Sequence, residues 1–171
     1  GERAEDESSK LSRRASQQEK AIERFNQRAA ITQELGKAIQ ENWEHVDSIL
    51  TQLSTAVEDK GWQDVAEIAR EVVWVDSVNP SEHTVVAYLP DEDGEPGAKV
   101  TLESSKTVHQ NAQRYFEEAR TQKNKAKGAQ EALEKTERSR KNAEKKAAKE
   151  AASGRLKGRK RARRFWFEKY R

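Results

Sequence analysis

The 171-residue chain contains no cysteine, no methionine and only three prolines. Without cysteine it has no disulfide framework, no thiolate metal site and no cysteine nucleophile. Hydrophobic residues make up 33% of the chain, against about 45–50% in ordinary globular domains, so we do not expect a large globular core. No apolar run approaches the roughly 20 residues of a membrane-spanning helix, and no signal peptide is visible. Because the chain starts at Gly1 rather than methionine, we expect it to be a piece of a longer protein.

Two stretches with a heptad period are the most informative feature that is present. Apolar and small residues recur at alternating steps of four and three, a mean of 3.5 that keeps one stripe of a helix facing a partner helix. The first stripe is Leu11, Ala15, Gln18, Ile22, Phe25, Ala29, Thr32, Gly36, Ile39, Trp43, Val46, Leu50, Leu53 and Val57. The second is Val108, Ala112, Tyr115, Ala119, Gln122, Ala126, Ala129, Leu133, Thr136, Arg140, Ala143 and Ala147. The sequence therefore predicts a mainly α fold, built on a long antiparallel two-helix coiled coil. Disorder is the alternative, because low hydrophobicity with 37% charged residues is also its signature.

The segment between the two stripes has a different composition and predicts a small α+β subdomain. Gly61 suits the left-handed position that ends a helix, and one apolar face predicts a short helix over 62–72. Two β-rich runs, 84–89 and 98–103, flank an acidic turn with two prolines and two glycines, which predicts a hairpin. After it, Thr107 with Gln110 three residues later forms a capping-box pattern for the return helix.

These patterns divide the chain into four predicted segments. They are an outgoing helix over 1–57, an α+β tip over 58–106, a return helix over 107–152, and a basic and aromatic segment over 153–171. In the last segment we expect kinks or frayed turns at Ser153-Gly154 and Gly158, because glycine weakens a helix.

Positive charge is concentrated at the end of the chain. From Arg138 to Arg171 there are fifteen Lys/Arg and three Asp/Glu, whereas the whole chain carries a net charge of only +3. Clustered cations release counterions when they meet a nucleic-acid backbone, so these residues are the candidate RNA-binding site. They are Arg155, Lys157, Arg159, Lys160, Arg161, Arg163 and Arg164. A solvated helix face and an acidic protein partner are the alternatives, and the composition does not distinguish RNA from DNA.

Other residue types give weaker indications. The three histidines lack a second ligand at metal-binding spacing, and no phosphate loop or nucleophile motif occurs, so we expect no metal, no cofactor and no enzymatic activity. Tryptophans gather in the middle of the chain, where Trp62 and Trp74 could contact a partner protein. Packing in the core of the subdomain is the alternative interpretation for both.

Three stretches of the chain resemble the middle region of the NFACT family of ribosome quality-control factors, which includes proteins once called fibronectin-binding protein A. The first runs from Ile31 to Leu50 and is followed by Gly61-Trp62. The second, 100–116, is similar to the family's strand leading into an Asn-Ala-x-x-Tyr helix start. The third, 159–170, resembles its Arg-Lys-x-x-Trp-Phe-Glu-Lys-Phe signature. Their order and spacing make the resemblance good over about residues 15–171.

The resemblance implies a cytoplasmic protein that binds the large ribosomal subunit, its RNA and its proteins, when stalled peptidyl-tRNA is present. It implies that the ribosome then extends the nascent chain with a carboxy-terminal tail, and that tRNA is read by flanking domains. Trp166, Phe167, Glu168 and Lys169 would form the junction to an RNA-binding domain. The insert between Trp74 and Lys99 is shorter than the inserts of long family members, and the acidity of the turn that ends it suggests an archaeal origin.

Two other interpretations compete with a ribosome-binding arm. Both stripes could pair between chains, which would make the protein a dimerising structural module. A DNA-associated coiled-coil arm of the condensin type also carries a subdomain at its end. We expect a monomer with an intramolecular coiled coil and no membrane association.

Overall fold

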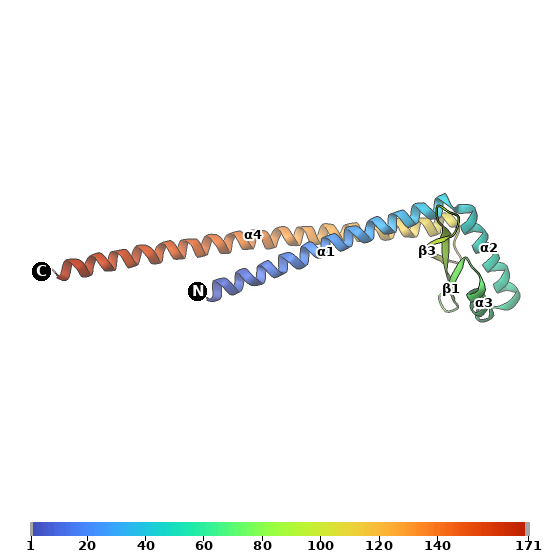
Figure 1. The fold of residues 1–171 in the computed structure, drawn as a ribbon, viewed down its shortest axis with the longest axis horizontal. Helices are drawn as coiled ribbons and strands as arrows, with labels where there is room; N and C mark the ends of the chain where they lie inside the picture. The colour runs from blue at the N-terminus through green and yellow to red at the C-terminus, as the bar shows by residue number, and fades with distance from the viewer. Residues whose placement is uncertain (1, 170–171) are drawn as a thin grey trace. The chain divides into compact units, whose positions relative to one another are not determined.

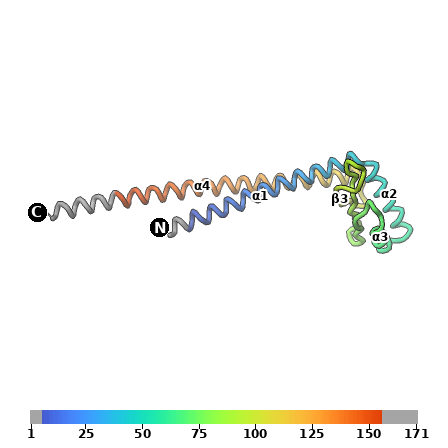
Figure 2. Tube along the Cα trace, viewed as in Figure 1, coloured from blue at the N-terminus to red at the C-terminus, as the bar shows by residue number. Residues whose placement is uncertain are grey.

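The computed structural model describes residues 2–169, and the side chains of residues 6–155 (Figure 2). It is mainly helical, with one small antiparallel sheet. The elements in chain order are α1 (Glu2–Glu41), α2 (Trp43–Lys60), α3 (Trp62–Ile68), the 3₁₀ helix η1 (Ala69–Glu71), β1 (Val75–Asn79), β2 (Thr84–Pro90), β3 (Pro96–Glu103) and α4 (Val108–Lys169). The chain forms two units, here called the helical unit (residues 1–24 and 125–171) and the mixed unit (residues 25–124).

Within each unit a stretch of α1 packs against a stretch of α4 (Figure 1). In the helical unit Ala15, Ala126 and Thr136 are buried, at 3%, 5% and 5% exposure. In the mixed unit Ala29, Ile39, Ala112 and Ala119 are buried in the same way. Every position of the two predicted stripes is at least partly buried except Trp43. The period of 3.5 therefore identified the packed face of both helices.

The predicted single outgoing helix over 1–57 is wrong at Asn42, where α1 ends and α2 begins. The Asn42 backbone has φ −109° and ψ 36°, outside the helical region. Its amide Nδ2 and its backbone N–H both donate to the carbonyl of Ala38, at 2.9 and 3.0 Å. Short polar side chains that bond the backbone in this way compete with the helix. Trp43 follows the break and is 56% exposed, so it leaves the stripe.

The sheet has the order β1-β2-β3, with both pairs antiparallel. The predicted hairpin is confirmed: Thr84 pairs with Glu103, and Tyr88 with Lys99. The sequence analysis missed β1, which joins β2 through a pairing that shifts register between Val75 and Ser77. On β2, Val85, Ala87 and Leu89 are buried in alternation with half-buried neighbours. One face of the sheet therefore faces the core, as the period of two requires.

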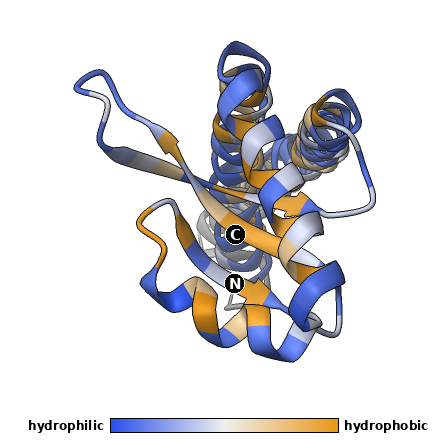
Figure 3. Cartoon of the chain, turned by 90° about the vertical axis from the view of Figure 1, so that its right-hand side faces the viewer, coloured by the Kyte–Doolittle hydropathy of each residue, from blue (hydrophilic) through white to orange (hydrophobic). Residues whose placement is uncertain are grey.

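The core of the mixed unit lies between the helices and the sheet. It contains Ile39, Val46, Leu50, Leu53, Val65, Val85, Ala87, Leu89, Val100, Leu102 and Ala112. Figure 3 shows hydrophobic segments on the helices and strands that surround this region. An isolated hairpin is only marginally stable, so the sheet depends on this contact with the helices.

Two helix ends in the mixed unit lie where the sequence predicted them, at Gly61 and Thr107. Gly61 ends α2 with a positive φ of 82°, as predicted, although its ψ of 164° lies outside the left-handed helical region. Its N–H donates to the carbonyl of Val57 at 2.9 Å. The capping box is formed: Gln110 N–H donates to Thr107 Oγ1 at 3.1 Å, and Thr107 N–H donates to Gln110 Oε1 at 3.0 Å. The short helix predicted over 62–72 divides into α3 and η1, which tightens the chain before β1.

The kinks predicted at Ser153-Gly154 and Gly158 are absent from the described backbone, because α4 continues to Lys169. The surrounding residues are mostly Ala, Lys and Arg, which favour helix. A single glycine costs about 1 kcal/mol, which such neighbours can offset.

Candidate interaction surfaces

The start of α4 binds the outer edge of β3 through three side chains. Thr101 N–H donates to the Tyr115 hydroxyl at 2.7 Å, and Arg114 Nη2 donates to the Thr101 carbonyl at 2.8 Å. Glu103 N–H donates to Asn111 Oδ1 at 2.8 Å, and Asn111 Nδ2 donates back to the Glu103 carbonyl at 3.2 Å. Side chains of α4 thus satisfy backbone groups on an edge strand that would otherwise invite pairing with another chain.

Sequence reasoning from the residues alone did not predict this role of Asn111, Arg114 and Tyr115. The available signal was their spacing of i, i+3 and i+4 at the start of a helix that directly follows a β-rich run. Asn111 has 0% exposure, and a fully buried amide requires partners such as these. The contact fixes where α4 begins relative to the sheet.

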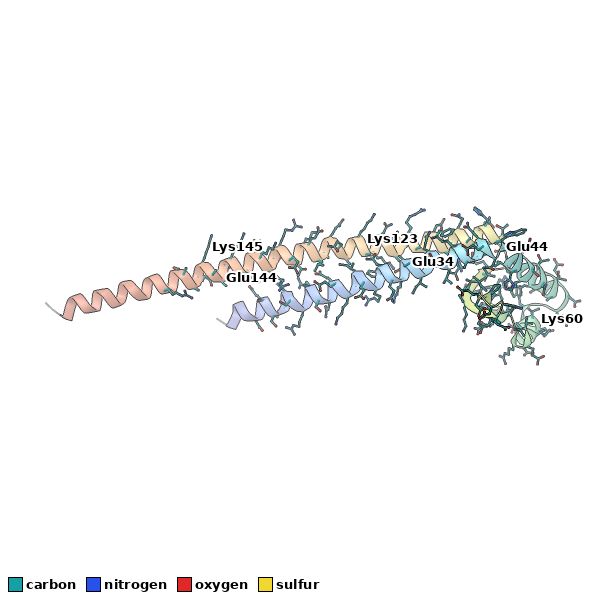
Figure 4. The ribbon with its side chains drawn as sticks, turned by 45° about the horizontal axis from the view of Figure 1, so that its top comes forward. Glu34, Glu44, Lys60, Lys123, Glu144 and Lys145 are labelled. Atoms are coloured by element: carbon teal, nitrogen blue, oxygen red, sulfur yellow. The ribbon has the colours of Figure 1, made fainter. Side chains whose placement is uncertain are left out.

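An exposed basic stripe lies on the part of α4 in the helical unit. Arg138, Lys141, Lys145 and Lys149 follow steps of three, four and four, so they lie on one helix face. All four are exposed, and they span about 16 Å of helix axis. Figure 4 labels Lys145 on this helix. The stripe can contact a row of phosphates.

The stripe overlaps only partly with the predicted RNA-binding residues. Arg155 is exposed on α4 in the same unit. The other predicted cations are Lys157, Arg159, Lys160, Arg161, Arg163 and Arg164, and their side chains lie outside the described residues. The same holds for Trp166, Phe167, Glu168 and Lys169 of the predicted domain junction.

The α+β part of the mixed unit, residues 43–107, has the opposite charge. It carries fourteen Asp/Glu and four Lys/Arg, a net charge of −10. Over residues 125–155 of α4 there are ten Lys/Arg and five Asp/Glu, a net charge of +5. Phosphate contact is therefore favoured on the helical unit and disfavoured on the α+β part.

Trp62 and Trp74, the predicted partner contacts, are both half-buried against histidine. Trp62 stacks on His83, with ring centroids 4.3 Å apart and planes 1° from parallel. Trp74 meets His45 edge to face at 4.6 Å, and His45 Nε2 donates to the carbonyl of Tyr88 at 2.9 Å. These contacts hold both tryptophans in place while part of each ring stays accessible to a partner.

Two carboxylates have perturbed acidity because they face cations or hydroxyls. The Tyr88 hydroxyl donates to Asp76 at 3.0 Å, which lowers the pKa of Asp76 and raises that of Tyr88. Lys99, 3.3 Å from Asp76, lowers the Asp76 pKa further and opposes the rise at Tyr88. The hydrogen bond from Lys106, at 2.7 Å, lowers the pKa of Glu103 although partial burial opposes it. Among the described residues no group of three His, Cys, Asp or Glu side chains could hold a metal ion.

Residues 1–157 match the family model of the NFACT N-terminal and middle domains. The chain belongs to the NFACT family. It is thus a member of a ribosome quality-control family. The matched range contains the basic stripe of α4 and the contacts of Asn111 and Tyr115 with β3. No curated protein matches this NFACT chain. Over the part of the chain that the structure describes, no helix has the length and apolar character needed to span a membrane.

Proposed function

We propose that this chain is the arm of an NFACT ribosome quality-control factor that docks on the large ribosomal subunit through RNA. The observation that supports this most directly is the exposed stripe Arg138, Lys141, Lys145 and Lys149 in a chain of this family. Four cations on one face match the repeating charge of a nucleic-acid backbone. The predicted cations from Arg155 to Arg164 continue the same basic segment.

The packed helices would act as a spacer. Their buried stripes have the 3.5-residue period of a coiled coil, which supports pairing within one chain and a monomeric arm as part of this proposal. A stiff helix pair holds its ends at a defined separation, about 1.5 Å per residue. The arm would then set the distance between the tRNA-binding domains of the factor and a distant ribosomal contact.

The chain would support tailing of the stalled nascent chain without catalysing a step itself. Binding to a subunit that holds peptidyl-tRNA positions the factor, and tRNA is recruited by flanking domains. Trp166, Phe167, Glu168 and Lys169 would join the arm to an RNA-binding domain. This assignment places the protein in the cytoplasm with the ribosome, and it requires no cofactor.

Salt-dependent binding to purified large ribosomal subunits tests the proposal. Binding of the chain is measured by co-sedimentation from about 50 to 300 mM KCl, beside a variant with Arg138, Lys141, Lys145 and Lys149 changed to Gln. Each cation that contacts phosphate contributes about 0.7–0.9 to the slope of log K against log salt. We expect the variant to bind more weakly and with a shallower slope. Charge reversal of Arg159, Lys160, Arg161, Arg163 and Arg164 to Glu should have the same direction of effect.

The matched control changes four exposed helical cations of the mixed unit to Gln: Arg28, Lys37, Arg120 and Lys123. It removes the same charge but should leave most of the salt slope unchanged. Equal slopes for the wild-type chain, the stripe variant and the charge-reversal variant would refute RNA docking through this segment. Equally tight binding to duplex DNA in competition would favour a DNA-associated arm instead.

A further inference from the structure

An open apolar groove lies within the mixed unit, between α2 on one side and α3, η1 and β1 on the other. Its volume is about 1050 Å³, at the upper end of the range for small-molecule sites. The floor is apolar and consists of Ile49, Leu53, Ala56, Val65, Val78 and Val85. A space of this size and lining can accept several apolar side chains from a partner.

One lip of the groove exposes hydrophobic side chains to solvent. Ile68 is 46% exposed, Val72 44%, and the adjacent Val73 69%. These are three of the five large exposed hydrophobic residues among the described side chains. Trp74, half-buried beside them, also lines the groove. A contiguous apolar lip of this kind is typical of a protein-docking surface.

The opposite wall is polar, and one end of the groove is acidic. Ser48, Thr51, Gln52 and Thr55 of α2 present uncharged hydrogen-bonding groups. Glu58 and Asp59 follow at the end of α2, next to the single cation Lys60 (Figure 4). The groove lies in the α+β part, whose net charge is −10. The negative electrostatic potential of this part attracts a basic partner and repels nucleic acid.

We propose that the groove binds one amphipathic helix of a basic partner protein. Its apolar face, with anchors at i, i+3, i+4 and i+7, fills the groove, while Lys or Arg side chains at one end meet Glu58 and Asp59. The lining consists of side chains from α2, α3, η1 and the sheet, which suits the apolar face of a helix. This docking is independent of the RNA contact proposed for the helical unit.

The test uses a fluorescein-labelled 18-residue helix of Leu and Lys as the probe and measures its affinity for the full chain by anisotropy. A Leu/Glu peptide with the same apolar face, and a Leu/Lys peptide with a central proline, are the comparison probes. We expect the Leu/Lys helix to bind at least tenfold tighter than either. Amide shifts on binding should concentrate in residues 48–60 and 68–75.

Variants locate the site. Ile68→Gln with Val72→Gln should weaken binding at least tenfold. Ile31→Gln, at a more exposed residue on α1 (56%), should change it less than twofold. Glu58→Gln with Asp59→Gln should weaken binding about fivefold, and Glu92→Gln with Asp93→Gln removes the same charge as its control. If the Ile68→Gln, Val72→Gln variant fails to fold, comparison of the Glu58/Asp59 variant with the Glu92/Asp93 control still tests the position of the site.

Four results would overturn the proposal. They are no binding of the Leu/Lys helix, equal binding by lip and control variants, equal binding of the Leu/Glu or proline probe, and displacement of the probe by single-stranded RNA. Because the assay contains no ribosome, its failure is separate from a failure of RNA docking.

Discussion

The Phe116 ring lies against the backbone of Gly36: a Cβ on residue 36 would lie 2.7 Å from Cε1 and 2.9 Å from Cδ1 of that ring. Carbon atoms do not approach this closely without displacement. Gly36 is buried on α1 and Phe116 is half-buried on α4, so the absence of a side chain at residue 36 allows the two helices their local separation. The glycine is thus a packing requirement rather than a weak point in the helix.

Replacement of Gly36 by Ala should destabilise the protein despite the higher helix propensity of alanine. The propensity gain is about 1 kcal/mol, and overpacking of this kind costs about 1–3 kcal/mol. We expect a net loss of about 1 kcal/mol in urea unfolding followed by circular dichroism. Gly128 on α4 is the control, because a Cβ there meets nothing within 4 Å; Gly128→Ala should stabilise.

A double-mutant cycle tests the cause. Phe116→Leu shortens the side chain that Gly36 accommodates, so the Gly36→Ala change should cost less in that background by about 1 kcal/mol. An additive result would mean that the contact between residues 36 and 116 does not limit the helix approach.

Asn111→Ala should be among the most destabilising single substitutions in the mixed unit. The Asn111 side chain is fully buried, accepts from Glu103 N–H and donates to the carbonyls of Glu103 and Thr107. Its removal leaves buried backbone groups without partners, at a cost of about 2–4 kcal/mol. Urea unfolding measures this loss, and hydrogen exchange of the Glu103 amide should accelerate at least tenfold.

Asn111→Asp separates hydrogen bonding from shape. Aspartate has nearly the same size as asparagine, but it places a carboxylate oxygen where the Asn111 amide N–H groups donate to backbone carbonyls in the native protein. Two acceptors then face each other, so this change should destabilise nearly as much as Asn111→Ala. The exposed Asn142 on the same helix is the control, and Asn142→Ala should cost nothing. Full stability of Asn111→Asp would show that packing alone holds α4 to β3.

Glu103→Gln should lower stability near neutral pH and not in acid. Lys106 lowers the pKa of folded Glu103, so the carboxylate contributes stability above its ordinary pKa and loses it as pH falls through the folded value. Since the side chain is 31% exposed, we expect only about 0.5 kcal/mol at pH 7. Urea unfolding of both proteins should show this difference vanish between about pH 5 and about pH 3. A constant difference across that range would contradict it, and Glu92→Gln is the exposed control.

The repeat in the sequence predicted the packed faces of α1 and α4 well. The stripe positions from Leu11 to Ile39 lie on the packed face of α1, and those from Val108 to Ala147 lie on the packed face of α4. A helix that packs along its length must place apolar residues at a regular step. The hairpin register and the capping box at Thr107 were also predictable, since each depends on residues close together in the chain.

Other features could not be read from the repeat, either because a local hydrogen bond interrupts the helix, as at Asn42, or because they depend on distant residues. The repeat runs through Asn42 without interruption, yet the helix breaks there. Strand β1 contains Asp76 and Ser77 and lacks a clear alternation, so its pairing with β2 decides its conformation. The groove was missed because its lip residues, Ile68 and Val72, fit a buried helix face by pattern and are exposed in the fold.

The sequence by itself determined two helices with a 3.5-residue stripe, an acidic middle and a basic end, because period and charge are properties of the chain alone. Tertiary structure decided how these parts are used. It placed Asn111 and Tyr115 on the edge of β3, set Phe116 against Gly36, and opened a groove beside α2. The contact of Phe116 with Gly36 and the lining of the groove join residues far apart in sequence, whereas Asn111 and Glu103 are close in the chain but lie on different elements. The energy of all these contacts exists only once the chain has folded.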